Sequence, residues 1–198
     1  MQLFPEKRSL GLIDSEIWYY PSFLEKAQAD FYFDTLKKDT PWRQDDIKVF
    51  GKIYAQPRLT ALYGNNGKSY SYSNIVMESL PFTKDLKHLK NLVDEEANIE
   101  FTTCLLNLYR DGKDSNGWHA DDEKELGQNP IIGSISLGAE RFFHLRHKSD
   151  KTVKHKVLLE HGSLLLMKGE TQHRWQHQIA KTAKKIGERI NLTFRIIQ

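Results

Sequence analysis

The sequence predicts a mainly β protein in which N-terminal helices support an antiparallel β-sandwich or barrel. Helical periodicity is confined to two segments in the first half of the 198 residues. From about residue 101 onward, short runs that suit strands are separated by Gly, Asp and Asn turns. The chain is 39% hydrophobic and shows neither a low-complexity linker nor a repeat of roughly 20–50 residues. We therefore expect one domain over residues 1–198, with a helical region (1–45), a middle region (46–100) and a β core (101–198).

The first predicted helix covers residues 20–38, "YPSFLEKAQADFYFDTLKK". Ser22 and Glu25 have the spacing of a capping box, which satisfies free N–H groups at a helix start. Helical spacing places four apolar side chains on one face: Phe23, Ala27, Phe31 and Leu36.

The second predicted helix covers residues 83–97, "TKDLKHLKNLVDEEA". Thr83 is the expected N-cap, because its hydroxyl can accept from a backbone N–H of the first turn. The residues expected to face inward are Leu86, Leu89, Val93 and Ala97.

Two predicted strands have one apolar and one polar face. In "RINLTFR" (189–195), alternation puts Ile190, Leu192 and Phe194 on one side of the strand. The other side carries Arg189, Asn191, Thr193 and Arg195. This polar side is either solvated or lines a pocket, where two guanidinium groups would bind a carboxylate-rich small molecule. In "TCLLNLYRDG", Asn107 and Tyr109 likewise lie opposite Leu106 and Leu108, and the same two interpretations apply.

The stretch "NGWHADDE" (116–123) contains a candidate metal-binding pair. His119 and Asp121 are two residues apart, so on an extended backbone both side chains project to the same face. A third ligand would complete a set of two histidines and one carboxylate, which is typical of non-haem Fe(II) oxygenases. An H-x-D pair alone is weak evidence in a chain with 8 histidines, so the site needs a partner.

Spacing alone does not select the third ligand from the downstream histidines. His147 and His155 lie in a basic run and are expected to be exposed, and His161 directly precedes a Gly-Ser turn. His173 and His177 are four residues apart and would share a face on a strand. The candidates are His144, His147, His155, His161, His173 and His177.

Charge is only mildly positive, at +3, but it is clustered. An excess this small does not by itself indicate a nucleic-acid partner, and a single charged run is typical of a solvated loop. Two runs near a suspected site carry more weight than one. The first run contains Arg146, His147, Lys148, Lys151, Lys154, His155 and Lys156, and the second contains Lys181, Lys184 and Lys185.

Cysteine content and hydropathy bound the compartment. Cys104 is the single cysteine, which suits a reducing environment. The N-terminus has no apolar signal core, and no run approaches the roughly 18 apolar residues of a membrane span. We expect a soluble monomer without a membrane partner, located in the cytoplasm, or in the nucleus if the source is eukaryotic.

Taken together, the motifs resemble the AlkB family of Fe(II)/2-oxoglutarate dioxygenases, which remove alkyl groups from nucleobases. The motifs are N-x-Y (107–109), H-x-D (119–121), W-x-H (175–177) and R-x-N-x-x-x-R (189–195). Their order and spacing are specific in combination, although each is weak alone. The resemblance runs from roughly residue 42 to the C-terminus, and the longest stretch that carries it is "NLYRDGKDSNGWHADDEKELGQNPIIGSISLGAERFF".

The resemblance implies a jelly-roll (double-stranded β-helix) core and assigns roles in the site. It makes His177 the third iron ligand beside His119 and Asp121, and leaves His173 as a surface or supporting residue. The residues that it assigns to 2-oxoglutarate are Asn107 and Tyr109 as contacts, Arg189 and Arg195 for its two carboxylates, and Thr193 in the pocket lining. With Fe(II), 2-oxoglutarate and O₂, the implied reaction is oxidative demethylation of N1-methyladenine and N3-methylcytosine, which releases formaldehyde, succinate and CO₂.

The resemblance also implies nucleic-acid contacts in "VFGK" (49–52) and "YSYS" (70–73). Phe50 would be a wedge that enters the duplex and Tyr72 would stack on the flipped base, whereas ordinary sheet packing is the alternative for both. Asp122 would accept a hydrogen bond from the exocyclic amine of the base. The other implied contacts are Gly51, Lys52, Tyr70 and Ser71 in these segments, and Arg58, Arg146, His147 and Lys148 at phosphates.

The preferred form of the nucleic acid is open at this point. "VFGK" and "RHK" are similar to a duplex-repairing member of the family, whereas "QPRLTALYG", "PIIGSISLG" and "TQHRWQH" are similar to one that prefers single strands. An aromatic wedge matters mainly when a stack must be opened, so Phe50 favours activity on duplex DNA. The alternatives are an RNA or protein substrate and a catalytically silent nucleic-acid-binding module.

Overall fold

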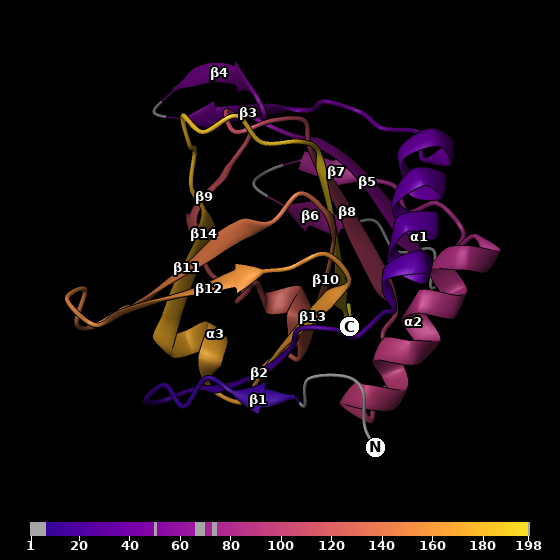
Figure 1. Cartoon of the computed structure of the whole chain (residues 1–198). Helices are drawn as coiled ribbons and strands as arrows, with labels where there is room; N and C mark the ends of the chain where they lie inside the picture. Colours follow the sequence, from indigo (N-terminus) through magenta and orange to yellow (C-terminus); the bar gives the residue numbers. More distant parts are fainter. Residues whose placement is uncertain (1–6, 50, 66–69, 73–74, 198) are drawn as a thin grey trace.

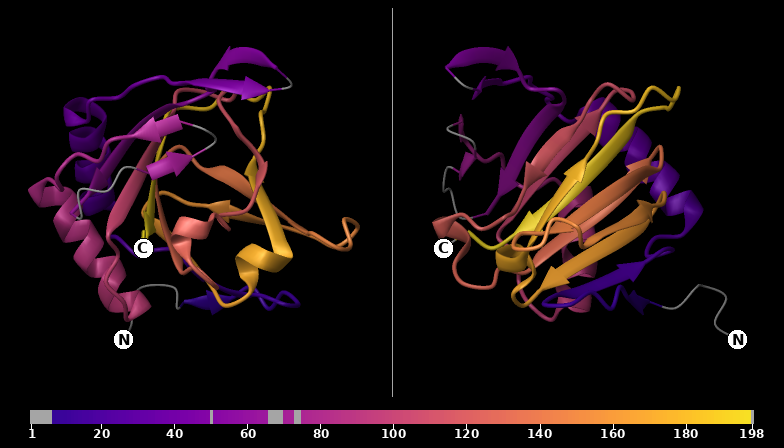
Figure 2. Two further views of the ribbon diagram at one scale, coloured as in Figure 1. Left: turned by 180° about the vertical axis from the view of Figure 1, so that it is seen from behind. Right: turned by 90° about the vertical axis from the view of Figure 1, so that its left-hand side faces the viewer.

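The computed structural model describes residues 7–49, 51–65, 70–72 and 75–197, and it has three layers (Figure 1). Helices α1 and α2 cover one face of a larger antiparallel sheet, and a smaller antiparallel sheet lies on the other side of it (Figures 1 and 2). The predicted fold class, mainly β with helices in the N-terminal half, is confirmed. Pairing of antiparallel sheets face to face is also the arrangement expected of a jelly roll.

The larger sheet has seven strands in the order β1-β2-β13-β10-β15-β8-β5. Its strands are β1 (Arg8–Ser9), β2 (Glu16–Tyr20), β5 (Leu59–Gly64), β8 (Thr103–Tyr109), β10 (Ile132–Gly138), β13 (Ser163–Lys168) and β15 (Arg189–Arg195). In register, Arg189 of β15 lies opposite Tyr109 of β8, and Asn191 lies opposite Asn107. Directly opposed residues share a face, so the polar faces predicted for these two strands form one surface.

The smaller sheet has four strands in the order β12-β11-β14-β9. Its strands are β9 (Asn116–His119), β11 (Arg141–His147), β12 (Lys154–Leu159) and β14 (Trp175–Ile179). Two hairpins stand apart from the main sheets, β3 (Asp46–Val49) with β4 (Lys52–Ala55) and β6 (Tyr70–Tyr72) with β7 (Ile75–Met77). The expectation of strands from about residue 101 onward holds, apart from two short helical turns, η1 (Lys124–Leu126) and α3 (Thr171–Arg174).

Helix α1 spans Lys26–Asp39 and starts later than predicted. The predicted cap at Ser22 is wrong: Glu25 and Gln28 form the capping box instead. The physical reason is tertiary, because Tyr20 is held in β2 opposite Leu164 of β13 and cannot join the helix. The predicted apolar face is also partly wrong, since Ala27 and Phe31 are exposed and the buried residues are Ala29, Tyr32 and Leu36.

Helix α2 spans Lys84–Ala97 and confirms the second helix prediction. The Thr83 hydroxyl accepts a hydrogen bond from the Leu86 N–H, as expected of an N-cap. All four residues predicted to face inward are buried, and they pack with Phe101 and Phe194 between the helices and the larger sheet. A second apolar cluster packs between the two sheets, beside the pocket described below.

No helix within the described ranges is long and apolar enough to cross a membrane.

Candidate active site

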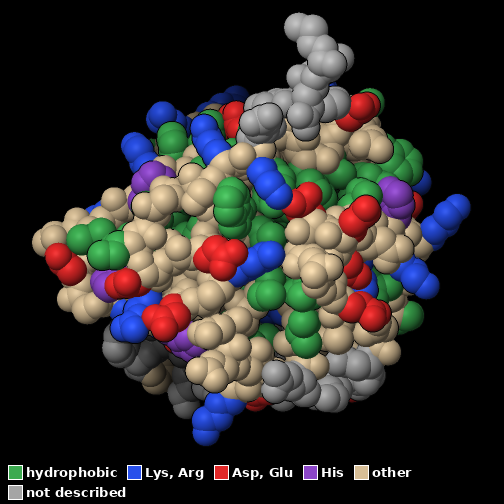
Figure 3. All heavy atoms as spheres, turned by 90° about the horizontal axis from the view of Figure 1, so that it is seen from below, with side chains coloured by type: hydrophobic (Ala, Val, Ile, Leu, Met, Phe, Trp, Pro, Cys, Tyr) green, Lys and Arg blue, Asp and Glu red, His purple; other side chains and the backbone are tan. Residues whose placement is uncertain are grey.

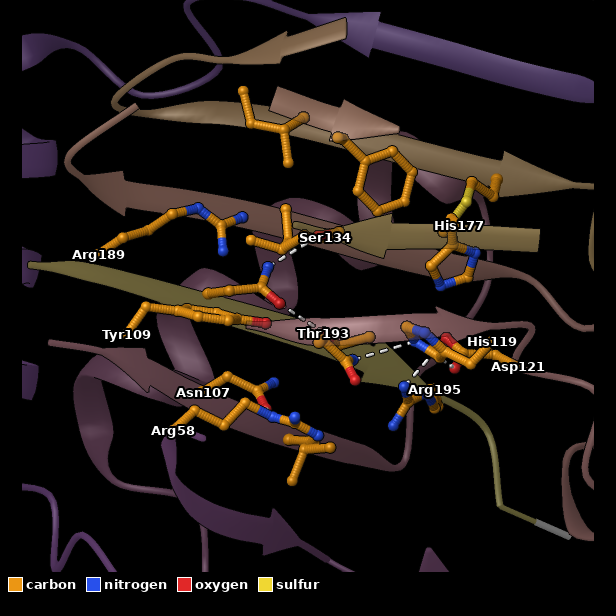
Figure 4. A pocket seen from close by; sticks show the side chains of 17 residues that line it. Arg58, Asn107, Tyr109, His119, Asp121, Ser134, His177, Arg189, Thr193 and Arg195 are labelled. Atoms are coloured by element: carbon orange, nitrogen blue, oxygen red, sulfur yellow. Dashed lines mark hydrogen bonds and ion pairs between the residues drawn. The ribbon is translucent and has the colours of Figure 1, made fainter. Parts of the chain in front are cut away.

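The polar faces of the larger sheet open into a pocket between the two sheets (Figure 4). The apolar residues of β15, Ile190, Leu192 and Phe194, belong instead to the core under the helices. The period-2 interpretation of this strand is therefore confirmed, and its polar side lines a pocket rather than a solvated surface. All eight residues expected to hold metal or 2-oxoglutarate line this pocket: Asn107, Tyr109, His119, Asp121, His177, Arg189, Thr193 and Arg195.

The smaller sheet brings the predicted metal ligands together. His119 ends β9 and lies directly opposite His177 of β14, and Asp121 follows two residues after His119. One ligand atom from each of the three residues lies within 4.8 Å of the others, and the two imidazole rings are 4.2 Å apart between centroids. Geometry thus selects His177 where spacing had left several histidines open.

The other candidate histidines have different roles. His161 accepts a hydrogen bond from the Gly138 N–H and lies 3.0 Å from Asp30 on α1. His173 is exposed and accepts from the Asn129 N–H. His147, which was expected to be exposed, is buried beside Trp175, because strand alternation in β11 turns it inward with Leu145.

The three ligands are held in the protonation states that a divalent metal requires. Burial raises the pKa of Asp121, but Arg195 and the two imidazoles outweigh this and hold it at about 2. Burial, reinforced by His119, lowers the pKa of His177 to about 3. Burial likewise lowers the pKa of His119. At neutral pH the site offers one carboxylate and two neutral imidazoles, each with a lone pair for a metal.

The hydrogen bonds around these ligands fit a metal ion. His119 Nδ1 donates to the Gly117 carbonyl at 2.7 Å, so Nε2 carries the lone pair, which accepts from the Asn116 side-chain amide at 3.1 Å. A metal ion would take the place of this donor. Asp121 Oδ2 accepts from Arg195 at 2.9 Å, whereas its buried Oδ1 has no hydrogen-bond partner within the described chain. A buried acceptor without a donor is costly, and a cation at this point would satisfy it.

The opposite end of the pocket is a cationic cradle (Figure 4). Arg189 is fully buried; its Nη2 donates to Ser136 at 2.9 Å, while Nε and Nη1 have no hydrogen-bond partner in the described residues. Its guanidinium lies 5.2 Å from the Tyr109 ring centroid. Burial lowers the pKa of Arg189 to about 10, so the group stays charged at neutral pH. Two unused donors on a buried guanidinium suit a carboxylate, which accepts two parallel hydrogen bonds.

Hydrogen bonds hold side chains in and behind the pocket, and two of the residues involved, Ser134 and Gln172, were not predicted from the sequence. Asn191 donates to Ser134 at 2.8 Å and accepts from Thr193 at 3.0 Å. Gln172 of α3, also fully buried, accepts from the Asp121 backbone N–H at 2.9 Å and so anchors the loop that carries a metal ligand. Alternation placed Asn191 on the polar face, whereas no local pattern connects Gln172 with a loop 51 residues earlier.

Arg58 does not have the role predicted from the sequence. It was expected at a phosphate, but it is only 3% exposed and its Nε donates to the side-chain amide oxygen (Oδ1) of Asn107 at 2.7 Å. Its Nη1 donates to the Ser115 carbonyl. A phosphate outside the protein does not reach this guanidinium, so the expectation is wrong, and Arg58 instead positions Asn107 in the pocket.

The basic segment 146–148 divides into three different environments. Arg146 stacks on Trp118, with 4.2 Å from the guanidinium carbon to the ring centroid, and donates to Gln176. His147 is buried, so its expected phosphate contact is also wrong. Lys148, expected at a phosphate, forms a 2.7 Å ion pair with Asp122, expected at the base.

The expected nucleotide-recognition segments lie in the two separate hairpins (Figure 1). Gly51 and Lys52 are exposed at the β3–β4 turn, where Gly51 has a φ of +79°, a conformation that suits glycine. Tyr70, Ser71 and Tyr72 form β6. Phe50 lies outside the described residues, so its role as a wedge stays a prediction.

Comparison with known proteins agrees with this site. The model of the 2OG-Fe(II) oxygenase superfamily matches residues 16–195. The human alpha-ketoglutarate-dependent dioxygenase alkB homolog 3 is 42% identical over 192 residues, which cover 92% of this chain and 66% of the relative. The Arabidopsis thaliana DNA oxidative demethylase ALKBH2 is 36% identical over 98% of this chain and 70% of its own length. This chain belongs to the AlkB family of 2OG-Fe(II) oxygenases.

The AlkB-family chain spans about two thirds of the length of the alkB homolog 3 relatives that it matches. A solved structure, that of OsALKBH1, superposes with a TM-score of 0.63 over 96% of this chain and 100% of the other, at 18% identity. That likeness supports the fold. Family membership identifies the metal expected at His119, Asp121 and His177 as Fe(II), with 2-oxoglutarate as the cosubstrate.

Proposed function

We propose that this chain catalyses oxidative demethylation of alkylated DNA, with N1-methyladenine and N3-methylcytosine as substrates. The observation that carries the proposal is the presence, in one pocket, of the His119–Asp121–His177 cluster and a buried guanidinium with two free donors. When bound, Fe(II) and 2-oxoglutarate supply the oxidising chemistry with O₂. The N-methyl group leaves as formaldehyde, and the keto acid leaves as succinate and CO₂.

The protein's part is to bind, orient and exclude water. Arg189 takes one carboxylate of 2-oxoglutarate through Nε and Nη1, with Asn107, Tyr109, Thr193 and Arg195 lining its path. Arg195 also donates to Asp121, so this guanidinium lies at the metal end of the pocket and holds a metal ligand in place. Enclosure between two sheets keeps bulk water from this chemistry.

DNA is the proposed substrate because relatives at 35–36% identity are named DNA oxidative demethylases. We propose that Tyr70, Ser71, Tyr72, Gly51 and Lys52 contact the nucleotide, and that Arg146 and Lys148 contact phosphates. Asp122 is proposed to accept a hydrogen bond from the exocyclic amine of the base. The base carries a positive charge in both lesions, so it competes with Lys148 for the Asp122 carboxylate. The pair is partly exposed and correspondingly weak, so exchange of partners is inexpensive.

The test is release of formaldehyde, with loss of N3-methylcytosine, from matched single-stranded DNA, duplex DNA and RNA. Fe(II), 2-oxoglutarate and ascorbate are supplied, and His119→Ala is the control. Repair by the wild type and not by the variant supports the proposal, and the ratio among the three substrates gives the preferred form. Turnover of 2-oxoglutarate without loss of methyl groups from DNA would leave the iron site correct and the substrate wrong.

A further inference from the structure

The outward side of the smaller sheet has no carboxylate among its strand positions. Burial alternates along β11 and β14, so every second residue points away from the pocket. Residues of β12 paired with them share that side, with Phe142 opposite Leu158 and His144 opposite Lys156. The outward positions are Phe142, His144, Arg146, Lys154, Lys156, Leu158, Gln176 and Gln178.

A groove of about 310 Å³ at one end of this side is bordered by the loop between β14 and β15. That loop contributes Lys181 and Lys184 to the lining, and β11 contributes Phe142 and His144. Among the described residues that line the groove, Glu140 is the one acid. We call Phe142, His144, Lys156, Lys181 and Lys184 the outer basic face.

The cations of the outer basic face are not neutralised from within. Lys156, Lys181 and Lys184 form no ion pair with a described residue, in contrast to Lys148 and Lys90. Phe142 is 44% exposed, and the Lys156 ammonium lies 4.9 Å from its ring centroid. Another face of the molecule differs, because Figure 3 shows acidic and basic side chains interspersed there. Unpaired cations around an exposed aromatic ring are the composition of a surface that binds phosphates and stacks a base.

No helix or strand in the described part of the chain covers this face. Both long helices lie on the far side of the larger sheet, as Figures 1 and 2 show. We propose that the outer basic face binds the single-stranded DNA that flanks the target nucleotide, with phosphates at the three lysines and a base against Phe142. The inference rests on the proposed function and adds a second contact surface outside the catalytic pocket. A single strand is the occupant because a duplex hides the faces of its bases from a side chain.

The experiment compares two charge-matched triple variants. K156Q/K181Q/K184Q removes the cations of the face, and K38Q/K84Q/K87Q removes three exposed lysines from α1 and α2 as the control. Binding of unmethylated single strands of about four and about twenty nucleotides is measured at several salt concentrations. For the long strand, loss of three phosphate contacts is expected to reduce the salt slope by about 2. The short strand, which fills only the catalytic pocket, should bind all three proteins alike.

Phe142→Ala is a separate arm, expected to weaken binding of the long single strand by about tenfold and to leave duplex binding unchanged. Equal salt slopes for the long strand in wild type and K156Q/K181Q/K184Q would overturn the proposal, as would an equal loss in the control triple. Equally strong competition by polyglutamate would overturn the assignment to nucleic acid. Binding to this face needs no lesion. If the wild type binds the long strand through this face but repairs no lesion, the proposed function is refuted and the inference about the outer basic face stands.

Discussion

Gln172 is expected to control metal affinity through a hydrogen bond to the backbone of a metal ligand. Its Oε1 accepts from the Asp121 backbone N–H at 2.9 Å, and both residues are buried. Gln172→Met removes this acceptor while keeping a similar volume. A buried N–H left without a partner costs about 1–3 kcal/mol. We expect the loop to relieve this cost by turning the N–H toward water, which would carry Asp121 away from the two histidines.

The measurable result is weaker metal binding, by roughly 5- to 150-fold for that energy range. Anaerobic titration with Co²⁺, followed by its visible absorption, gives the dissociation constant without turnover. Thr171→Val is the matched control, because Thr171 is equally buried on the same helix but bonds Glu16 rather than the metal loop. Both variants should lose stability, whereas only Gln172→Met should lose metal affinity. An unchanged Co²⁺ dissociation constant in Gln172→Met would refute the reasoning.

Three further perturbations follow from other parts of the structure. Arg189→Lys keeps the positive charge but loses the planar guanidinium, so the KM for 2-oxoglutarate should rise about tenfold or more. Arg141→Lys is the control: the Arg141 side chain donates to backbone carbonyls, so this variant should lower the melting temperature and leave that KM unchanged. Gly133→Ala puts a Cβ 2.6 Å from a methyl carbon of Val93, and chemical denaturation should show a loss of about 1–3 kcal/mol in the free energy of unfolding. Val93→Ala removes the clashing methyl group, so the double variant should lose less stability than the sum of the two single variants. Burial raises the pKa of Tyr19 from 10.0 to about 12, so as pH rises the unfolded chain loses this phenol proton before the folded protein does. The free energy of unfolding of the wild type should therefore fall between pH 10 and pH 12, and it should fall less steeply in Tyr19→Phe, which has no phenol proton to lose.

The sequence was informative where a local rule determines the structure. Alternation along residues 189–195 placed two arginines on one face because side chains in a strand must alternate. The same rule applied to β11 would have turned His147 inward, but its basic neighbours favoured an exposed loop instead. The cap of α1 was misplaced because pairing of Tyr20 with β13 decides where that helix can begin. The role of Gln172 could not be predicted from the sequence, because only the folded sheets bring its partner, the Asp121 backbone N–H, beside it.

The pocket itself indicates the shape of the ligand that it is built to hold. Folded proteins pair nearly all their buried polar groups, so unpaired groups that line a pocket indicate what its ligand must satisfy. Here they have opposite sign: two free donors on Arg189 at one end and one free acceptor on Asp121 at the other. The first calls for an anion and the second for a cation, with Tyr109, Asn191 and the other lining residues between them. A metal ion at the histidines with a dicarboxylate reaching back to Arg189 satisfies both ends at once, which neither ligand does alone.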